Sequence, residues 1–227
     1  MIKLNITGID EAGRGSIIGP LVIAGVCANK ETIKEFKKIG IKDSKKLTRK
    51  DRERFAKIII QKSNECSIRK LSPKKIDRAV MLRKKNKNRK LNFQAKNYGG
   101  LNELEACAMS SILNKLNSEI AFIDSCDVNP KRFKIKIKSL MQKKIKMYSL
   151  HKADEIYTIV SAASILAKCI RDKEIYTLQR RYGLIGSGYP SDNKTRVFLK
   201  TWNLKNDNKP NFSRKSWKTW DKILKNK

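Results

Sequence analysis

Short apolar runs alternate along this chain with longer segments in which apolar residues recur every three or four positions. The short runs predict β-strands, and the longer segments predict amphipathic helices. The predicted strands are Lys3–Ile9, Leu21–Ala28, Cys66–Leu71, Ile120–Asp124 and Lys146–Leu150. The predicted helices are Thr48–Lys62, Pro73–Leu82, Leu101–Leu116, Pro130–Met141 and Glu155–Tyr182. This alternation indicates an α/β fold, with one sheet flanked by helices.

The pattern changes after Gly183, which ends the last long helix. A turn-rich segment, Gly186–Pro190, precedes two short predicted helices that carry all three tryptophans, Asn193–Trp202 and Arg214–Leu224. We therefore predict an α/β domain over residues 1–183 and a helical extension over residues 184–227.

The charge of the chain indicates an anionic partner. Lys and Arg number 53 against 21 Asp and Glu, which gives a formal net charge of +32 and a pI near 10.1. The longest apolar stretch, Ile17–Ala28, is broken by glycine and proline and is too short to span a bilayer. Because the charge is spread along the chain rather than collected in one tail, nucleic acid is favoured over an anionic membrane surface. A merely solvated basic surface is the alternative. The run Arg83–Lys90 has no apolar period and is interpreted as an exposed loop.

The cysteines and the N-terminus favour a cytoplasmic protein. The five cysteines are widely spaced and form no C-x-x-C pair, which is typical of reduced thiols rather than of a zinc site or a disulfide framework. Residues 1–10 lack the apolar run and cleavage site of a signal peptide.

Four acidic residues lie where predicted strands end. Asp10 and Glu11 close the first strand, Asp124 closes the fourth, and Asp154 follows the fifth. Strand ends converge on one edge of an α/β sheet, so these carboxylates would repel one another unless cations lay between them. Hard oxygen ligands favour Mg²⁺ or Mn²⁺, and two such ions about 3.5–4 Å apart can cleave a phosphodiester. Taken singly, Asp124 or Asp154 would be interpreted as a helix cap.

Other polar residues are compatible with nucleic-acid chemistry. Ser161, Ser164 and Lys168 share one face of the last long helix, and phosphate oxygens are natural partners for such a group. The single histidine, His151, is interpreted as structural, because two-metal chemistry does not need a histidine base.

Seven motifs follow one another along nearly the whole chain: Gly8-Ile-Asp-Glu-Ala-Gly-Arg-Gly15, Gly19-Pro20, Asp43-Ser-Lys-Lys-Leu47, His151-Lys-Ala-Asp154, Ser161-Ala-Ala-Ser-Ile-Leu-Ala-Lys168, Gly188-Tyr-Pro190 and Arg214-Lys-Ser-Trp-Lys-Thr219. Together with Asp124, these motifs resemble ribonuclease HII, the type 2 ribonuclease H, and the last of them is similar to archaeal members. Arg14 and Ala12 favour type 2 over the type 3 family. Lys30–Gly40 and Arg83–Tyr98 resemble nothing in the family.

The resemblance implies a ribonuclease H-like mixed β-sheet flanked by helices, with a C-terminal helical extension that contributes to substrate binding. It also implies roles for individual residues, which fall into four groups. These are metal-binding carboxylates (Asp10, Glu11, Asp124, Asp154), a segment that reads the 2′-hydroxyl (Gly13, Arg14, Gly15), contacts to the DNA backbone (Lys46, Ser164, Lys168) and a tyrosine that packs on the following deoxyribose (Tyr189).

The activity so implied is hydrolysis of the RNA strand of RNA–DNA hybrids, including single ribonucleotides in duplex DNA, with two Mg²⁺ or Mn²⁺ ions. The products would carry a 3′-hydroxyl and a 5′-phosphate. A monomer is expected, and a replication clamp is a candidate partner. Two alternatives stay open: a catalytically silent basic nucleic-acid-binding module, and another nuclease or integrase of the same superfold. The four acids argue against the first, and Gly13-Arg14-Gly15 with Tyr189 argues against the second.

Overall fold

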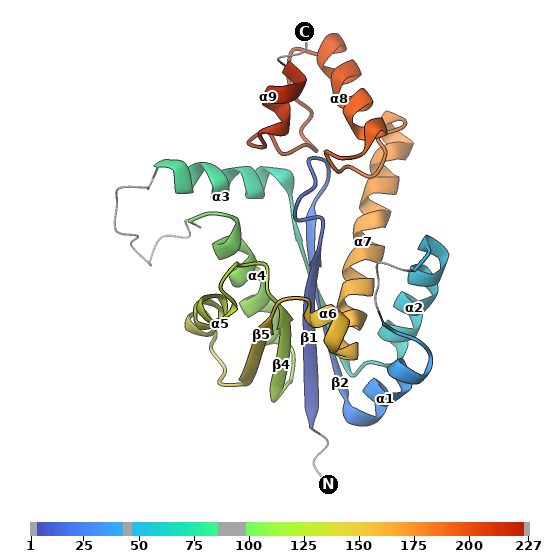
Figure 1. Ribbon diagram of the computed structural model, residues 1–227, viewed down its shortest axis with the longest axis vertical. Coiled ribbons are helices and arrows are strands. Elements are labelled where there is room, and N and C mark those ends of the chain that lie inside the picture. Colours follow the sequence, from blue (N-terminus) through green and yellow to red (C-terminus); the bar gives the residue numbers. More distant parts are fainter. Residues whose placement is uncertain (1–3, 43–46, 86–98, 225–227) are drawn as a thin grey trace. The chain divides into compact units, whose positions relative to one another are not determined.

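The structure of this chain is a computed structural model that describes residues 4–42, 47–85 and 99–224 (Figure 1). The chain forms two compact units whose segments alternate along the sequence. The first unit comprises Met1–Ala12, Val22–Arg69 and Glu105–Cys169. The second comprises Gly13–Leu21, Lys70–Leu104 and Ile170–Lys227. The predicted boundary after residue 183 stays a prediction.

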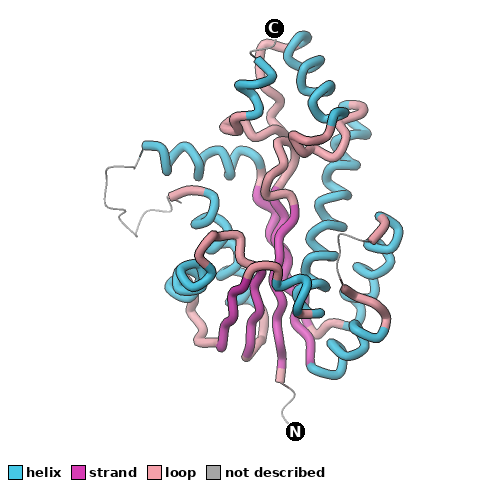
Figure 2. Tube along the Cα trace, in the orientation of Figure 1, coloured by secondary structure: helices cyan, strands magenta, loops and turns pink. Residues whose placement is uncertain are grey.

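A five-stranded mixed sheet forms the centre of the first unit, as the sequence predicted (Figure 2). Its order is β3-β2-β1-β4-β5, with β1 antiparallel to β2, parallel to β4, and β4 parallel to β5. The bounds are β1 Asn5–Ala12, β2 Leu21–Asn29, β3 Glu65–Leu71, β4 Ile120–Asp124 and β5 Lys146–Leu150.

Helices α4 (Leu101–Lys115) and α7 (Thr158–Tyr182) cover opposite faces of this sheet. A Cβ added at Gly8 would lie 2.2 Å from the carbonyl oxygen of Ile159 in α7. A Cβ added at Gly25 would lie 2.4 Å from Cγ2 of Ile112 in α4. Gly25 pairs with Ile9, the neighbour of Gly8, and successive residues of a strand face opposite sides. Glycine at these two positions therefore lets a helix approach each face closely.

Helix α1 (Lys30–Lys38) was missed by the sequence analysis, which predicted no element there. Asn29 caps it, because its side-chain oxygen accepts a hydrogen bond from the backbone N–H of Thr32 at 2.9 Å. Only Phe36 of the helix is buried, and its two apolar positions, Ile33 and Phe36, were overlooked in a short lysine-rich segment. The other helices of the first unit are α2 (Arg49–Lys62), α5 (Pro130–Ser139) and α6 (Ala153–Ile156).

The predicted long helix Glu155–Tyr182 is divided in two. Tyr157, between α6 and α7, has extended backbone angles of −113° and 115°. Its ring stacks on Phe122 of β4 with centroids 4.1 Å apart. The stacking of these two half-buried rings favours the break at a position that helical periodicity alone would have passed through.

The second unit is held together by a separate apolar cluster and by helices α3 (Pro73–Lys85), α8 (Asn193–Lys205) and α9 (Thr219–Leu224). Ile17 and Ile18 pack there with Trp220 of α9 and with Leu199 of α8. The C-terminal helix begins at Thr219 rather than at the predicted Arg214. The preceding residues instead run alongside the Ile17–Ile18 segment, where Ser213 and Ile18 form a β-bridge.

The prediction that Arg83–Lys90 forms a loop is wrong for its first three residues, because α3 continues to Lys85. The remainder of that loop lies outside the described residues. The described part of the chain contains no helix with the length and apolar character needed to cross a bilayer.

Candidate active site

The strands of the first unit bring two of the predicted carboxylates, those of Asp10 and Asp124, to one edge of the sheet. The parallel pairing of β1 with β4 ends at Ile9 and Ile123, so Asp10 and Asp124 are the next residues on neighbouring strands. From the apolar pattern, Asp10 and Glu11 were predicted to close the first strand. β1 instead continues to Ala12, because its antiparallel pairing with β2 outlasts its pairing with β4.

Asp154 reaches this edge through a short turn after β5. Lys152 adopts left-handed backbone angles of 55° and 37°, which is uncommon for a residue other than glycine. The carboxylate of Asp124 accepts a hydrogen bond from the N–H of the next residue, Ala153, at 2.9 Å. The hydroxyl of Ser161 donates to the carbonyl oxygen of Asp154 at 2.5 Å. The turn and α6 are thus fixed to the end of β4 and to α7.

The surroundings of Asp10 raise its pKa strongly. Burial, which leaves 4 % of the residue exposed, and the charges of Asp124 and Asp154 raise the pKa of Asp10 to about 7. Hydrogen bonds from the Ser164 hydroxyl and the Glu11 amide, the latter at 2.7 Å, work in the opposite direction. The net effect shows that this pocket disfavours negative charge that nothing else balances.

The donor set of the site suits a hard divalent cation. Asp10, Glu11, Asp124 and Asp154 offer only carboxylate oxygens, the ligands that Mg²⁺ and Mn²⁺ prefer. Within the described residues, no three His, Cys, Asp or Glu side chains are grouped closely enough to form a ready metal site. The pKa of Asp10 is raised first by burial and then by the charges of Asp124 and Asp154, and a bound cation would offset both effects. The metal-ligand assignment stays a prediction.

The three residues predicted to contact the backbone of the DNA strand differ in where the structure places them. Ser164 is fully buried in α7 and hydrogen-bonds to Asp10, so the structure places it with the carboxylates. The ammonium of Lys168 donates to the Ser164 hydroxyl at 3.0 Å, one helical turn further along. Lys46 lies outside the described residues. Contact of these residues with a DNA backbone stays a prediction.

In the second unit, a buried arginine forms hydrogen bonds to the Gly13-Arg14-Gly15 turn. This arginine was not predicted from the sequence. Arg214 is 0 % exposed, and its two terminal nitrogens donate to the carbonyl oxygens of Gly13 and Arg14, each at 2.5 Å. The Arg14 side chain donates to Asn102 at 2.6 Å. The turn is therefore held by its carbonyls on one side and by the side chain of Arg14 on the other.

The two glycines of this turn have different surroundings. Gly13 has a φ of +87°, and a Cβ there would lie 2.9 Å from the carbonyl oxygen of Pro20. Gly15 has no atom within 4 Å of the position a Cβ would take, and it is exposed. Glycine is thus required at position 13 by the fold, whereas the open space at Gly15 leaves its backbone accessible to a ligand.

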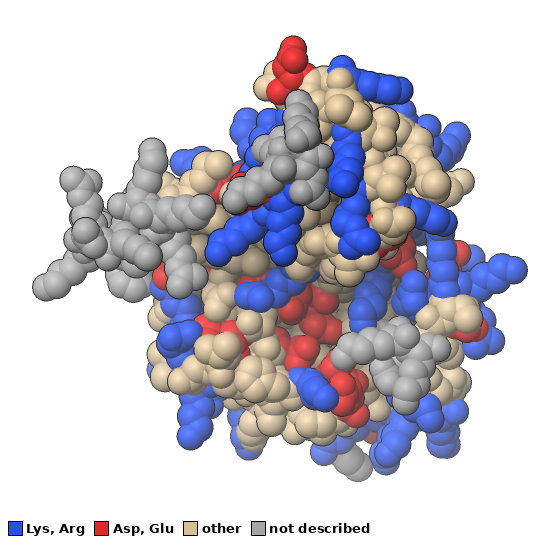
Figure 3. All heavy atoms as spheres, turned by 45° about the horizontal axis from the view of Figure 1, so that its top comes forward, with Lys and Arg blue, Asp and Glu red and all other residues tan. Residues whose placement is uncertain are grey.

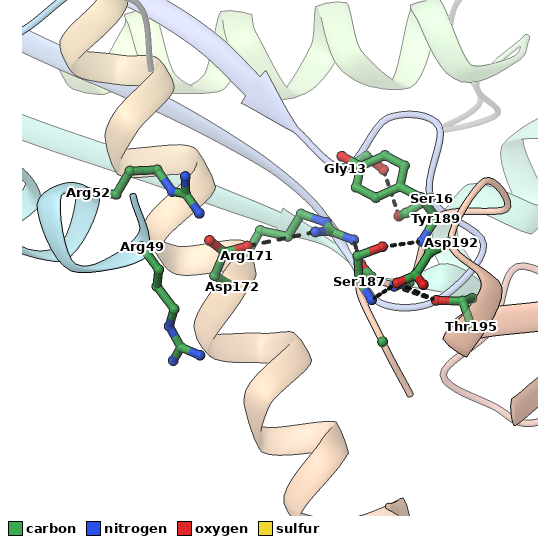
Figure 4. Close-up of polar contacts among 12 residues, drawn as sticks. Gly13, Ser16, Arg49, Arg52, Arg171, Asp172, Ser187, Tyr189, Asp192 and Thr195 are labelled. Carbon is green, nitrogen blue, oxygen red and sulfur yellow. Dashed lines mark hydrogen bonds and ion pairs between the residues drawn. The ribbon is translucent and has the colours of Figure 1, made fainter. Parts of the chain in front are cut away.

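Tyr189 lies on a loop that is fixed by its own hydrogen bonds (Figure 4). The carboxylate of Asp192 accepts from the Ser187 N–H at 2.5 Å. The Thr195 hydroxyl accepts from the Gly188 N–H at 2.9 Å and donates to the Ile185 carbonyl at 2.9 Å. The Gly188 carbonyl in turn accepts from the amides of Ile17 and Ile18. This loop and the segment that follows Gly13-Arg14-Gly15 are therefore joined within one unit.

A second buried arginine, Arg171, lies against this loop and was also missed. Arg171 lies one helical turn before Ile175, which belongs to the apolar cluster of this unit, but this spacing alone does not distinguish a buried guanidinium from a solvated one. Lys and Arg side chains are spread over the face of the molecule that Figure 3 draws, in keeping with the net charge of +32.

Comparison with known proteins identifies the family. The family model described as Ribonuclease HII matches residues 7–220. Ribonuclease HII of Cenarchaeum symbiosum is 40% identical over 213 residues, which are 94% of this chain and 95% of the relative. The crystal structure of ribonuclease H2 from Pyrococcus horikoshii has a TM-score of 0.83 at 36% identity and covers 98% of both chains.

A further solved structure, of the PCNA:RNase HII complex from Archaeoglobus fulgidus, has a TM-score of 0.80 at 36% identity and covers 96% of both chains. These likenesses extend over nearly the whole chain and confirm the fold that the sequence predicted. The chain therefore belongs to the ribonuclease HII family, the type 2 ribonucleases H, which are divalent-metal-dependent endonucleases that cut the RNA strand of RNA–DNA hybrids.

Proposed function

We propose that this chain cleaves RNA–DNA hybrids and single ribonucleotides in duplex DNA on the 5′ side of the ribonucleotide, leaving a 3′-hydroxyl and a 5′-phosphate. The observation that carries the proposal is that Asp10 and Asp124 directly follow the paired ends of β1 and β4, with the turn before Asp154 hydrogen-bonded to Asp124. The raised pKa of the buried Asp10 agrees with this arrangement. A cluster of this kind is costly to the fold unless cations offset it, and cations are what phosphodiester hydrolysis at such a site requires.

In this proposal, Asp10, Glu11, Asp124 and Asp154 hold two divalent ions, Mg²⁺ or Mn²⁺. When bound, the ions would activate a water molecule and neutralise charge on the scissile phosphate. Asp10 would take the central position, because the charges of Asp124 and Asp154 both act on its carboxyl group. Ser164 holds the carboxylate of Asp10 through its hydroxyl, and the amide of Glu11 holds the same carboxylate from its own strand.

Junction recognition is assigned to the second unit. The backbone of the Gly13-Arg14-Gly15 turn would read the 2′-hydroxyl, a group that is both donor and acceptor and that distinguishes RNA from DNA. The open surroundings of Gly15 support this assignment, since a sugar could approach its backbone closely. Tyr189 would pack on the deoxyribose that follows. Residues 184–227 would contribute to substrate binding, with Lys46 and Lys168 assigned to the backbone of the DNA strand. Ser164 is fully buried and is assigned to Asp10 instead.

A direct test is to map the cut on a DNA duplex that contains one ribonucleotide, end-labelled on either side, with Mg²⁺ and with a chelator. The expected result is a single Mg²⁺-dependent cut 5′ to the ribonucleotide, with a 5′-phosphate on the downstream product. Binding without cleavage would favour a silent nucleic-acid-binding module. Cleavage without regard to the ribonucleotide would favour a different nuclease of this fold.

We also propose that this chain binds a replication clamp. Its support is the Archaeoglobus fulgidus structure, which is described as a complex of PCNA with RNase HII. Titration of this chain with the clamp of its own organism, followed by calorimetry, tests the proposal. Heat of binding that saturates would support it, and the absence of binding at high micromolar concentration would end it.

A further inference from the structure

Arg171 is an unusual residue to find inside the second unit. Only 5 % of it is exposed, and burial lowers the pKa of its guanidinium. Its ion pair with the neighbouring Asp172 is long, with Nη1 and Oδ1 3.9 Å apart. Its Nε is buried and finds no hydrogen-bond acceptor among the described residues. A buried charge with a long ion pair and an unpaired N–H lowers the stability of the fold. Arg171 is therefore expected to have a role other than stabilising the fold.

The contacts of Arg171 lead to Tyr189 (Figure 4). The guanidinium carbon lies 4.5 Å from the centroid of the Tyr189 ring, the geometry of a cation–π contact. Nη2 of the same side chain donates to the carbonyl oxygen of Ser187 at 2.6 Å. One planar group therefore supports the aromatic ring and fixes the backbone two residues before it.

The same guanidinium also fills the space beside the Gly13 turn. A Cβ at Gly13 would lie 2.6 Å from Nε and 2.7 Å from Cδ of Arg171. A Cβ at Gly188 would lie 3.2 Å from Nη2. Both glycines have positive φ values, of +87° and +80°. The turn that contains Gly13 and the loop that carries Tyr189 therefore pack on a single side chain.

We propose that Arg171 is a positioning residue that determines specificity, because it sets the Tyr189 ring and the Gly13 turn in one fixed relation. This inference rests on the proposed function, in which the turn reads a ribose and Tyr189 reads the following deoxyribose. Recognition of a junction requires both sugars to be read at the correct separation. The rigid planar side chain of Arg171, which packs against both the Gly13 turn and the Tyr189 ring, provides that separation.

The test is a double-mutant cycle with two substrates. One substrate is duplex DNA with a single ribonucleotide, and the other is a continuous RNA–DNA hybrid. Junction selectivity is the ratio of their kcat/KM values. Tyr189→Ala and Arg171→Met should each lower this ratio by about 10-fold, within the range expected for loss of one aromatic contact to a nucleotide. The double variant should be no less selective than Tyr189→Ala, because both changes remove the same element.

Two further variants make the result decisive. Arg171→Lys keeps the charge and lacks the plane and the fork, so it should also lose selectivity, and it carries the test if Arg171→Met does not fold. Arg181→Met is the matched control, since Arg181 lies 5.3 Å from the Tyr182 ring on the same helix. It should leave the ratio unchanged.

The outcomes separate the two proposals. If Tyr189→Ala lowers the ratio but neither Arg171 variant does, Arg171 only supports the fold and the inference is wrong. Losses that add in the double variant would likewise overturn it. If Tyr189→Ala leaves the ratio unchanged, the assigned role of Tyr189 fails, and the role of Arg171 fails with it.

Discussion

At the scale of single residues, the chemistry of this chain is concentrated at Asp10. Its carboxyl group lies at the end of a buried parallel strand pair, under the influence of Asp124 and Asp154. A carboxyl group with an ordinary pKa near 3.8 when unfolded and about 7 when folded binds its proton more tightly in the folded chain. Asp10 therefore contributes stability below about pH 4, and this contribution is lost as the pH rises through 7.

This pKa predicts a pH-dependent effect on the stability of the metal-free protein. The melting temperature of the wild-type chain minus that of Asp10→Asn should fall between pH 5 and pH 8 in the presence of a chelator. Added Mg²⁺ or Mn²⁺ should reverse the fall, because a cation favours the charged carboxylate. Thermal melts of both proteins across this range provide the measurement. A constant difference would show that Asp10 does not titrate there.

The two glycines of the Gly13-Arg14-Gly15 turn yield opposite predictions. Gly15→Ala should change the free energy of unfolding by less than about 1 kcal/mol, since its φ is not left-handed and the Cβ meets no atom. It should nevertheless reduce cleavage at a single ribonucleotide roughly 10-fold or more, if a sugar approaches this backbone. Gly13→Ala should cost about 1–3 kcal/mol, because its φ is +87° and Arg171 and Pro20 occupy the space.

Urea denaturation and kcat/KM on both variants check this pair. A Gly15→Ala enzyme as active as the wild type would remove the turn from substrate contact. A Gly13→Ala protein of unchanged stability would contradict the packing against Arg171.

The carboxylates could be predicted from the sequence, and the buried arginines could not. Acids at strand ends stand out because few acids occur in this chain and strand ends are recognisable from apolar runs. Arg171 and Arg214 are two of 53 basic residues, and nothing in their immediate sequence separates a buried guanidinium from a solvated one. Their roles depend on carbonyls and rings far away in the sequence.

At the scale of secondary-structure elements, the apolar pattern predicted most of the strands of the sheet and the helices that pack on them. The strands β2, β4 and β5 and the helices α2, α4 and α5 were found to within a few residues. The errors have local causes that patterning does not reveal. α1 depends on the Asn29 cap, the break before α7 depends on the stacking of Tyr157 on Phe122, and the late start of α9 depends on pairing of Ser213 with Ile18.

An element-scale prediction concerns the attachment of the C-terminal segment to α3. The buried carboxylate of Asp77 accepts from the N–H groups of Lys215 and Ser216, both at 2.9 Å, and from the Ser216 hydroxyl at 2.6 Å. Asp77→Ala leaves these donors without their acceptor and should lower the free energy of unfolding by about 2–3 kcal/mol. Cleavage should also fall, because the neighbouring Arg214 grips the Gly13-Arg14-Gly15 turn.

Asp221→Ala, at an exposed position of α9, is the control and should be nearly neutral. Equal stability of the two variants by chemical denaturation would show that the Asp77 bonds contribute little. Reduced stability with full activity would show that the hydrogen bonds from Arg214 to the turn do not depend on the hydrogen bonds of Asp77.

At the scale of the whole molecule, the net charge of +32 predicts strong salt dependence of substrate binding. If about 4–6 phosphates are neutralised, the logarithm of the association constant should fall with log[salt] at a slope of roughly −4 to −5. Fluorescence anisotropy with a labelled hybrid, from low to high salt, provides the slope. A slope near zero would mean that the basic side chains are not turned towards the substrate.

The most direct measurement for this account is the single-turnover cleavage rate of Asp10→Asn on an RNA–DNA hybrid, with hybrid binding measured on the same protein. The substitution keeps the shape of the side chain and removes the charge that is proposed to hold the metal ions. We expect the rate to fall by about 100-fold or more with binding unchanged or tighter, because electrostatic contributions of this size are usual at such sites. Near-wild-type turnover by a correctly folded Asp10→Asn protein would contradict the central claim.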